Sequence, residues 1–350
     1  MSATIRDVAA RAGVSVATVS RVVNRSPHRV RPATQRRVLA AVRALGYHAN
    51  IIAQGLKKRS TRTVALIVPD ISNPFFPAIA RGIEDVARSR GYAVLLCNTY
   101  EDLDRERAYL ALLANRMVDG VIFATVGSNT AHLRALRREH RPVVLVARDV
   151  EGVRIDTVLV DNFRGEFEAT THLIKLGHRR IVHITGPHSL HVAAERRRGY
   201  LQALAAARVP KADAVIVGGD FAADGGRRAV QRLLERGVRF TAVAAANDLM
   251  AIGAMEALRT AGRRVPEDVA VVGFDDITFA SLVSPALTTV AQPKYRMGQM
   301  AMERLLQLMD GTDRSPRQTI LAPQLVIRDS CGARTAGDAA PSPAGMASRT

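Results

Sequence analysis

The apolar positions of the first 46 residues recur at helical spacing and are interrupted twice, which predicts three short helices. Thr4 is placed to cap the first helix, with Asp7 three residues later as its partner. Gly13 suits a left-handed stop, Ser15 a second cap, and Pro32 the first turn of the third helix. The positions expected to face inward are Ile5, Val8, Ala9, Ala12, Val14, Val19, Val22, Val23, Val38, Ala41, Val42 and Leu45.

From Thr63 onward, short apolar runs alternate with longer amphipathic stretches, a pattern typical of parallel strands covered by helices on both faces. The runs form two series, so we expect an α/β fold with two doubly wound parallel sheets behind the helical unit. Ligands of such folds bind beyond the carboxyl ends of the strands, here between two lobes. The predicted strands are 64–68, 93–97, 120–124 and 143–146 in the first series, and 181–185, 214–217, 242–245 and 269–274 in the second.

Positive charge is concentrated at the start of the chain. Residues 1–60 contain twelve Lys or Arg and a single acid, Asp7, so this segment carries +11 of the net charge of +18. Two short helices joined by a tight turn are the arrangement that places a helix in the major groove of DNA. A local excess of Lys and Arg is the electrostatic signature of phosphate binding. Together these features predict a DNA-binding headpiece.

Composition argues against several other classes of protein. No apolar run approaches the roughly 20 residues that span a bilayer, and the polar N-terminus gives no secretory signal. Cys97 and Cys331 are too few for a disulfide framework or a metal cluster, and they fit a reducing cytoplasm. We expect Cys97 to be packed in a strand and Cys331 to be a stray thiol. Residues 331–350, rich in Gly, Ala, Ser, Thr and Pro, are expected to be disordered.

A series of motifs follows the chain from residue 3 to residue 330. They are 4–9 with 14–21, 73–76 (NPFF), 118–120 (VDG), 161–162, 176–181 (LGHRRI), 195–200, 247–251 (NDLMA), 272–276 (VGFDD), 286–290 and 292–293. On these motifs, taken in this order, the chain resembles the lactose-repressor/galactose-repressor family of bacterial transcription factors. One such match alone would carry little weight, but the series is highly specific.

The resemblance implies how the chain is divided. It places the headpiece at 1–48, a hinge helix or linker at 49–61, and a core for effector binding and dimerisation at 62–330. The core is expected to be similar to a periplasmic sugar-binding protein, with three crossovers between its lobes. The N-lobe would hold about 62–161 and 292–322, and the C-lobe about 162–291 and 323–330. No leucine heptad follows, so a tetramer held by a helix bundle is not expected.

For DNA, the resemblance implies a homodimer that reads a pseudo-palindromic operator with the helix at 16–24 in the major groove. Val16 and Ala17 would choose bases, and Arg21 would donate to a guanine, with a phosphate contact as the alternative. Leu56 would enter the minor groove as a wedge, the alternative being a leucine packed on the headpiece. The DNA-binding residues so assigned are Thr4, Ser15, Val16, Ala17, Thr18, Ser20, Arg21, Asn24, Asn50, Ala53 and Leu56.

The linker departs from the family pattern at two positions. Ala49 replaces the usual proline before the hinge asparagine, and Gly55 costs roughly 1 kcal/mol of helix stability. We therefore expect a hinge helix whose folding depends strongly on DNA.

A small-molecule effector is implied in the cleft between the lobes. Arg196 matches the family's ligand arginine, and Asn247 and Asp275 match two further polar contacts, although Asp275 could instead cap a loop or helix. The aromatic candidates are stacking surfaces for a sugar ring or, equally, core residues. The assigned effector-binding residues are Phe75, Phe76, Asp149, Arg196, Phe221, Asn247 and Asp275. We expect a basic, partly apolar pocket that suits a sugar, a sugar acid or a sugar phosphate.

Two other functions remain as alternatives. An enzyme on a doubly wound fold is disfavoured because the sequence shows neither a GxGxxG motif nor a P-loop after the first strand, and no nucleophile–base group. A sugar carrier is disfavoured because no export signal is present. We expect a regulator, most often a repressor, of carbohydrate-related genes, with operator DNA, a sugar-like effector and a second copy of the chain as partners. No catalytic residue, cofactor, metal or membrane contact is expected, and the bacterial cytoplasm, at the nucleoid, is the expected location.

Overall fold

A computed structural model describes residues 3–23, 30–47, 60–100, 102–114, 117–124, 131–139, 141–150, 152–210, 213–312 and 315–333. The chain divides into two compact units, Met1–Arg62 and Thr63–Thr350. Four of the predicted DNA-binding residues and most of the linker at 49–61 lie outside the described residues; the four are Asn24, Asn50, Ala53 and Leu56. No helix among the described residues is both long and apolar enough to cross a membrane.

The first unit contains the three predicted helices, α1 (Ile5–Ala12), α2 (Val16–Val23) and α3 (Pro32–Ala44). Thr4 and Asp7 form a complete capping box at the start of α1, and Gly13 adopts a left-handed conformation with φ of 61° at its end. The Ser15 hydroxyl accepts from the Thr18 amide at 3.2 Å and so caps α2. A small apolar core formed by the three helices fixes their arrangement, with fully buried members Val8, Ala9, Ala12, Val19, Val22, Val38 and Ala41.

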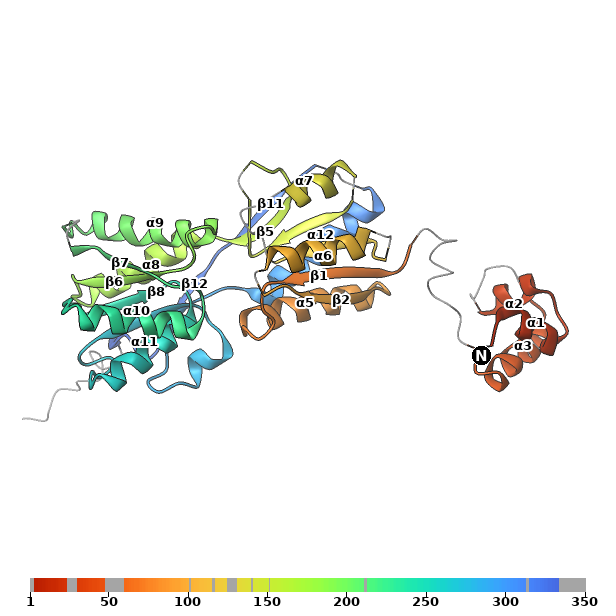
Figure 1. The fold of residues 1–350 in the computed structure, drawn as a ribbon, viewed down its shortest axis with the longest axis horizontal. Helices are drawn as coiled ribbons and strands as arrows, with labels where there is room; N and C mark the ends of the chain where they lie inside the picture. Colours follow the sequence, from red (N-terminus) through yellow and green to blue (C-terminus); the bar gives the residue numbers. More distant parts are fainter. Residues whose placement is uncertain are drawn as a thin grey trace, which may run out of the picture. The chain divides into compact units, whose positions relative to one another are not determined.

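The described part of the second unit contains two six-stranded sheets, each with its own helices (Figure 1). We call the lobe built on the first sheet the N-lobe; its strand order is β11-β5-β4-β3-β1-β2. Its strands are β1 (Thr63–Val68), β2 (Ala93–Asn98), β3 (Gly120–Phe123), β4 (Val143–Val146), β5 (Asp156–Val160) and β11 (Gln318–Leu321). Its helices are α5 (Phe75–Ser89), α6 (Leu103–Ala114), α7 (Ala131–Arg138) and α12 (Lys294–Asp310).

The second sheet, with the order β12-β10-β9-β8-β6-β7, forms what we call the C-lobe. Its strands are β6 (Ile181–Thr185), β7 (Val215–Gly218), β8 (Ala242–Ala245), β9 (Ala270–Asp275), β10 (Thr288–Ala291) and β12 (Gln324–Val326). Its helices are α8 (Asn162–Lys175), α9 (His191–Ala206), α10 (Ala223–Glu235), α11 (Asp248–Thr260) and the short 3₁₀ helix η2 (Thr278–Ser281). The predicted α/β fold with two parallel-rich sheets is confirmed.

The described chain passes between the lobes at three places, after β5, after β10 and after β11. The last passages complete both sheets: β11 pairs in parallel with β5, while β12 pairs with β10 in the antiparallel sense. Sequence patterning predicted neither β11 nor β12, nor β5 and β10. Strand β12 also makes the second sheet mixed where a purely parallel one was expected.

The expectation for the tail is wrong at its beginning. Cys331 is buried and not a stray thiol: it accepts from the Thr288 hydroxyl at 3.1 Å and lies 3.3 Å from His172 Nε2. The neighbouring Ser330 donates to the Val271 carbonyl at 2.6 Å. These contacts attach the chain to β9, β10 and α8, which is why order extends at least to residue 333. Residues 334–350 of the predicted tail lie outside the described residues.

Candidate functional site

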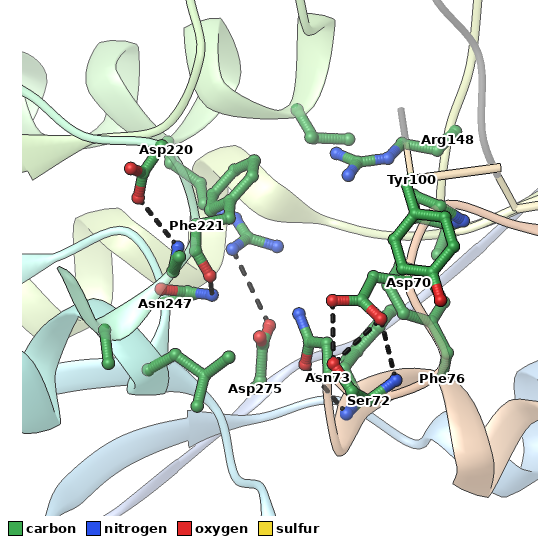
Figure 2. Close-up of a pocket in the computed structure, with 18 residues that line it drawn as sticks. Asp70, Ser72, Asn73, Phe76, Tyr100, Arg148, Asp220, Phe221, Asn247 and Asp275 are labelled. Atoms are coloured by element: carbon green, nitrogen blue, oxygen red, sulfur yellow. Dashed lines mark hydrogen bonds and ion pairs between the residues drawn. The ribbon is translucent and has the colours of Figure 1, made fainter. Parts of the chain in front are cut away.

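A cavity of about 360 Å³ lies where the carboxyl ends of strands from both lobes meet, the place expected for a ligand of this fold (Figure 2). The N-lobe contributes the segments after β1, β2 and β4 and the start of α5. The C-lobe contributes α9, the start of α10, the start of α11 and the end of β9. The described lining residues are Pro69, Asp70, Ser72, Asn73, Phe75, Phe76, Tyr100, Ala147, Arg148, Val192, Arg196, Asp220, Phe221, Ala222, Ala223, Asn247, Leu249 and Asp275.

Arg196 extends from α9 into this cavity and is almost completely buried. Its Nε donates to Asn162 Oδ1 at 2.9 Å, and its Nη1 donates to the backbone carbonyl of Ala246. The guanidinium carbon lies 3.7 Å from the centroid of the Phe274 ring, and Nη1 lies 3.7 Å from Asp275 Oδ1. Burial lowers the pKa of Arg196, and the Asp275 carboxylate opposes that shift. Contacts within the protein therefore hold the arginine in one orientation.

Asp275 stands at the end of β9, where the sequence placed it, and faces the cavity opposite Arg148 and Asp70 (Figure 2). Its Oδ1 accepts from Gln292 Nε2 at 2.7 Å. Burial raises the pKa of the Asp275 carboxyl, and the neighbouring charge of Arg196 limits the rise. Its backbone φ of 121° lies in a region that residues with a side chain rarely occupy. A strained aspartate at a strand end is typical of a functional position.

Asn247 and Phe221 form a connected pair on the C-lobe wall. The Asn247 side chain caps α11 by accepting from the Met250 amide at 2.9 Å, and it donates to the Phe221 carbonyl at 2.9 Å. Phe221 itself has a left-handed φ of 63°. The guanidinium carbons of Arg148 and Arg196 lie 5.4 Å and 5.8 Å from the centroid of its ring. The ring thus contributes an apolar surface beside two cationic groups.

The N-lobe wall carries the other two predicted aromatics. Phe75 and Phe76, the first residues of α5, pack edge to face with centroids 5.1 Å apart. Both are buried and belong to the N-lobe core, yet both also line the cavity. Both alternatives predicted from the sequence therefore apply to each residue: its ring belongs to the core and also lines the cavity.

The structure does not bring Asp149 into the cavity. Its Oδ2 lies 2.7 Å from His191 Nδ1, so the carboxylate bridges to α9 instead. The cavity is lined instead by the preceding residue, Arg148. Ala147, with a left-handed φ of 58°, turns the backbone immediately before these two residues. The resemblance in sequence correctly locates this loop at the cavity, but it does not determine which of its side chains lines the cavity.

Sequence reasoning also missed the polar residues of the loops. Asp70 and Asp220 line the cavity, the first bound by the Ser72 hydroxyl at 2.8 Å and the second by Arg228 at 2.7 Å. Counted over the described lining, three Asp face two Arg. The expectation of a basic pocket is therefore wrong. The loop after β1, with its Pro69-Asp70 start directly after a buried strand, was the signal that could have indicated the missed residues.

The headpiece presents a second candidate surface on α2. Val16 is 41% exposed, and Ala17 and Arg21 are also exposed, so the predicted base-reading side of the helix is open. The hydroxyls of Ser15 and Thr18 lie 2.9 Å apart at the start of α2, while the Thr4 hydroxyl is occupied by Asp7 in its capping box. Ser20 is half-buried. Of these residues, Arg21 carries the longest donor group on the exposed side.

Comparison with known proteins gives two family matches. Residues 4–50 match the family described as bacterial regulatory proteins, lacI family, and residues 170–331 match the periplasmic binding protein-like domain. The chain is 39% identical over 311 residues to catabolite control protein A of Priestia megaterium, covering 89% of this chain and 93% of that protein.

Two solved structures show that the likeness extends to the fold. The transcriptional regulator CelR in complex with cellobiose is 36% identical, with a TM-score of 0.73 over 94% of this chain and 99% of that chain. The lac repressor dimer bound to operator and the anti-inducer ONPF is 29% identical, with a TM-score of 0.84 over 95% of this chain and 99% of that chain. The relatives are regulators of transcription and not enzymes. This chain therefore belongs to the lacI family of bacterial DNA-binding transcription regulators, the lactose-repressor/galactose-repressor group.

Proposed function

We propose that this regulator is a repressor of carbohydrate-related genes that binds a pseudo-palindromic operator as a homodimer and responds to a neutral sugar in the cavity between its lobes. The observation that carries the proposal is the prepared site around Arg196 and Asp275, buried and hydrogen-bonded in a cavity that both lobes line. A ligand held by both lobes changes their preferred separation, and this difference in binding is what couples a cavity to a distant DNA-binding unit. The cytoplasm is the compartment that this role requires.

Charge and shape favour a neutral sugar over a sugar acid or sugar phosphate. Asp70 and Asp275 are acceptors for sugar hydroxyls, and the arginines are donors in a planar arrangement. Three carboxylates around one cavity would repel a phosphate, whose charge the two arginines would have to offset. The aromatic rings of Phe75, Phe76 and Phe221 supply apolar surface for the C–H face of a sugar ring.

Exposed apolar side chains support a homodimer. Leu95 and Leu96 are 42% and 43% exposed on β2, which is the edge strand of the N-lobe sheet. In the C-lobe, Phe279 of η2 is 49% exposed, and Leu282, the residue that follows this helix, is 71% exposed. Exposed leucines on an edge strand are an aggregation hazard unless another surface covers them. A second copy of the chain is the partner that also supplies the second headpiece for an operator with two half-sites.

Effector binding can be tested by a thermal-shift screen of the full-length protein against neutral sugars, sugar acids and sugar phosphates. We expect a neutral sugar to raise the Tm by several degrees, since ligand at 100 times its Kd adds about 2.7 kcal/mol. Arg196→Lys should lose this shift because a lysine cannot reproduce the planar donor group. Arg197→Lys, on the exposed side of the same helix, is the matched control. Stabilisation by phosphorylated sugars alone would contradict the proposed ligand class.

Operator binding can be tested by selecting DNA from a random library with the full-length protein. An enriched inverted repeat is expected, and Arg21→Ala should relax the preference at one symmetric pair of positions by about 1–3 kcal/mol. Affinity should fall steeply with salt because residues 1–60, the headpiece with its linker, carry +11 of the net charge of +18. Enrichment of single, unpaired half-sites would contradict recognition of the operator by a dimer.

A further inference from the structure

The end of β9 is a strained turn, and one of the side chains that bind it belongs to the other lobe. Asp275 and Asp276 have consecutive positive φ values of 121° and 53°, and neither is a glycine. Such conformations are unfavourable for residues with a side chain and persist only where surrounding contacts fix them. The contacts responsible should therefore be found around these two residues.

Three side chains from later segments of the chain donate to this turn. Lys294 Nζ donates to the backbone carbonyls of Asp275 and of Asp276, the second at 2.8 Å. Gln292 donates to the Asp275 carboxylate, and Arg328 Nη2 donates to Asp276 Oδ1 at 2.7 Å. Of these three donors, the lysine is the one that binds the strained backbone, at two consecutive carbonyls. Within the C-lobe, the Asp276 amide also donates to the Thr289 hydroxyl at 3.4 Å.

Lys294 is also the first residue of α12, a helix of the N-lobe. Helix α12 packs on α5, and its buried Met297, Ala301 and Leu305 belong to the N-lobe core. The next residue, Tyr295, donates its hydroxyl to Asp85 of α5 at 2.9 Å. One ammonium group thus connects the rigid start of an N-lobe helix to the C-lobe strand that ends in the cavity aspartate.

We infer that Lys294 is a positioning residue that holds the Asp275 turn in shape and ties it to the N-lobe, so that a ligand bound at Asp275 acts directly on the joint between the lobes. The role assigned to Asp275 as a ligand contact rests on the proposed function, whereas the hold on the turn does not. The charge of Lys294 acts on the carboxyls of Asp248 and Asp275, and Asp275 also feels the charges of Arg196 and Arg148.

The hold on the turn can be tested without any ligand by hydrogen–deuterium exchange of the full-length protein. In Lys294→Met, exchange of the amides at 274–278 should rise at least tenfold, with β6 as an unchanged internal reference. Arg296→Met, which removes an exposed charge from the same helix, should stay within threefold of the wild type. The inference would be overturned if Lys294→Met exchanged the amides at 274–278 at the wild-type rate, or if exchange in β6 rose equally. If Lys294→Met does not fold, Lys294→Gln tests the inference in its place, and exchange at 274–278 should then rise at least threefold.

The proposed link between the lobes through Lys294 requires a separate measurement. Spin labels on cysteines introduced at Glu84 of α5 and Arg232 of α10 report the distance between the lobes, because both positions are exposed. The native Cys97 and Cys331 are buried and should not be labelled. We expect Lys294→Met to broaden the distance distribution, while Arg296→Met leaves it unchanged. An unchanged distribution in Lys294→Met would overturn the interlobe part of the inference, whether or not a sugar proves to be the effector.

Discussion

Several side chains around the cavity stabilise the fold as well as being placed to contact a ligand. Asn247 is the clearest example, since one oxygen caps α11 while its amide nitrogen holds the Phe221 carbonyl. Arg196 similarly binds Asn162, the first residue of α8, and Ala246, the residue after β8. Substitutions at such positions affect stability and ligand binding together, so the two effects have to be separated by the choice of replacement.

The variants Asn247→Ala and Asn247→Ser separate the effect on stability from the effect on ligand binding. The alanine variant loses the cap and should be destabilised by about 1 kcal/mol or slightly more. Serine is an equally good cap but is too short to hold Phe221, so Asn247→Ser should recover most of the stability measured by urea unfolding. Both variants should bind a stabilising sugar more weakly. Equal stability of the alanine and serine variants would show that the cap contributes little.

Asp248 gives the site a dependence on pH. It is fully buried, accepts from the Ile277 amide at 2.8 Å and from the Thr289 hydroxyl, and lies near Asp275. Burial, and then repulsion by Asp275, raises the pKa of its carboxyl well above the usual value. A raised pKa in the folded state means that the group's contribution to stability is complete below its unfolded pKa of about 4 and is lost as the pH rises through the folded pKa.

The free energy of unfolding of the wild type, relative to that of Asp248→Asn, should therefore decrease as the pH rises from 4.5 to 7. Urea unfolding at three pH values in this range would measure the difference. Asp224→Asn, on the exposed first turn of α10, serves as the matched control for removal of a carboxylate. A constant difference for Asp248→Asn would argue against the raised pKa.

At the scale of elements, the helix pair α5 and α12 shows how closely the N-lobe is packed. A Cβ built on Gly298 would lie 2.1 Å from the carbonyl oxygen of Ile79, and one on Gly82 would lie 2.1 Å from that of Tyr295. The two backbones therefore approach each other in a way that only glycine permits. This contact also sets the position of Phe75 and Phe76 at the start of α5 relative to Lys294 at the start of α12.

Gly298→Ala should destabilise the protein by about 1–2 kcal/mol, because a clash with backbone lies in the upper half of the roughly 1–3 kcal/mol range for overpacking and exceeds the gain of about 1 kcal/mol in helix propensity. Chemical denaturation of the full-length protein would measure this change. Arg296→Ala, at an exposed position on the same helix, should change stability by less than about 0.5 kcal/mol. A Gly298→Ala variant more stable than the wild type would mean that the helices can separate at little cost.

Some elements and site residues could be predicted from the sequence, and others could not. All eight predicted strands are present, because each is a short, continuous apolar run beside a turn residue. The unpredicted strands are shorter or more polar, and β11 pairs with β5 across more than 150 residues, so no local pattern indicates them. The residues carried over from motifs at strand ends, Asn247 and Asp275, do line the cavity. The loop residues Asp70, Tyr100 and Asp220 depend on backbone turns that a residue pattern does not reveal.

At the scale of the whole molecule, the proposed dimer makes a prediction about DNA. Leu96→Glu and Leu282→Glu each place a charge on an exposed apolar surface, so sedimentation should show a shift from dimer to monomer. Affinity for DNA with two half-sites should then fall by at least tenfold, while affinity for a single half-site stays the same. Ile216→Glu, at an exposed position on the edge strand β7, is the matched control. Dimers that persist in both leucine variants would place the interface elsewhere.

The late position of α12, β11 and β12 in the chain has a consequence for how the protein emerges from the ribosome. The N-lobe core includes Met297, Ala301, Met302 and Leu305 of α12, yet all of that lobe except α12 and β11 is synthesised before the C-lobe begins. Until these last segments appear, the nascent N-lobe has an uncovered apolar face and β5 has an unpaired edge. Folding during synthesis can therefore complete the headpiece but neither lobe, and a message truncated before codon 294 would yield an aggregation-prone product, not a partly active regulator.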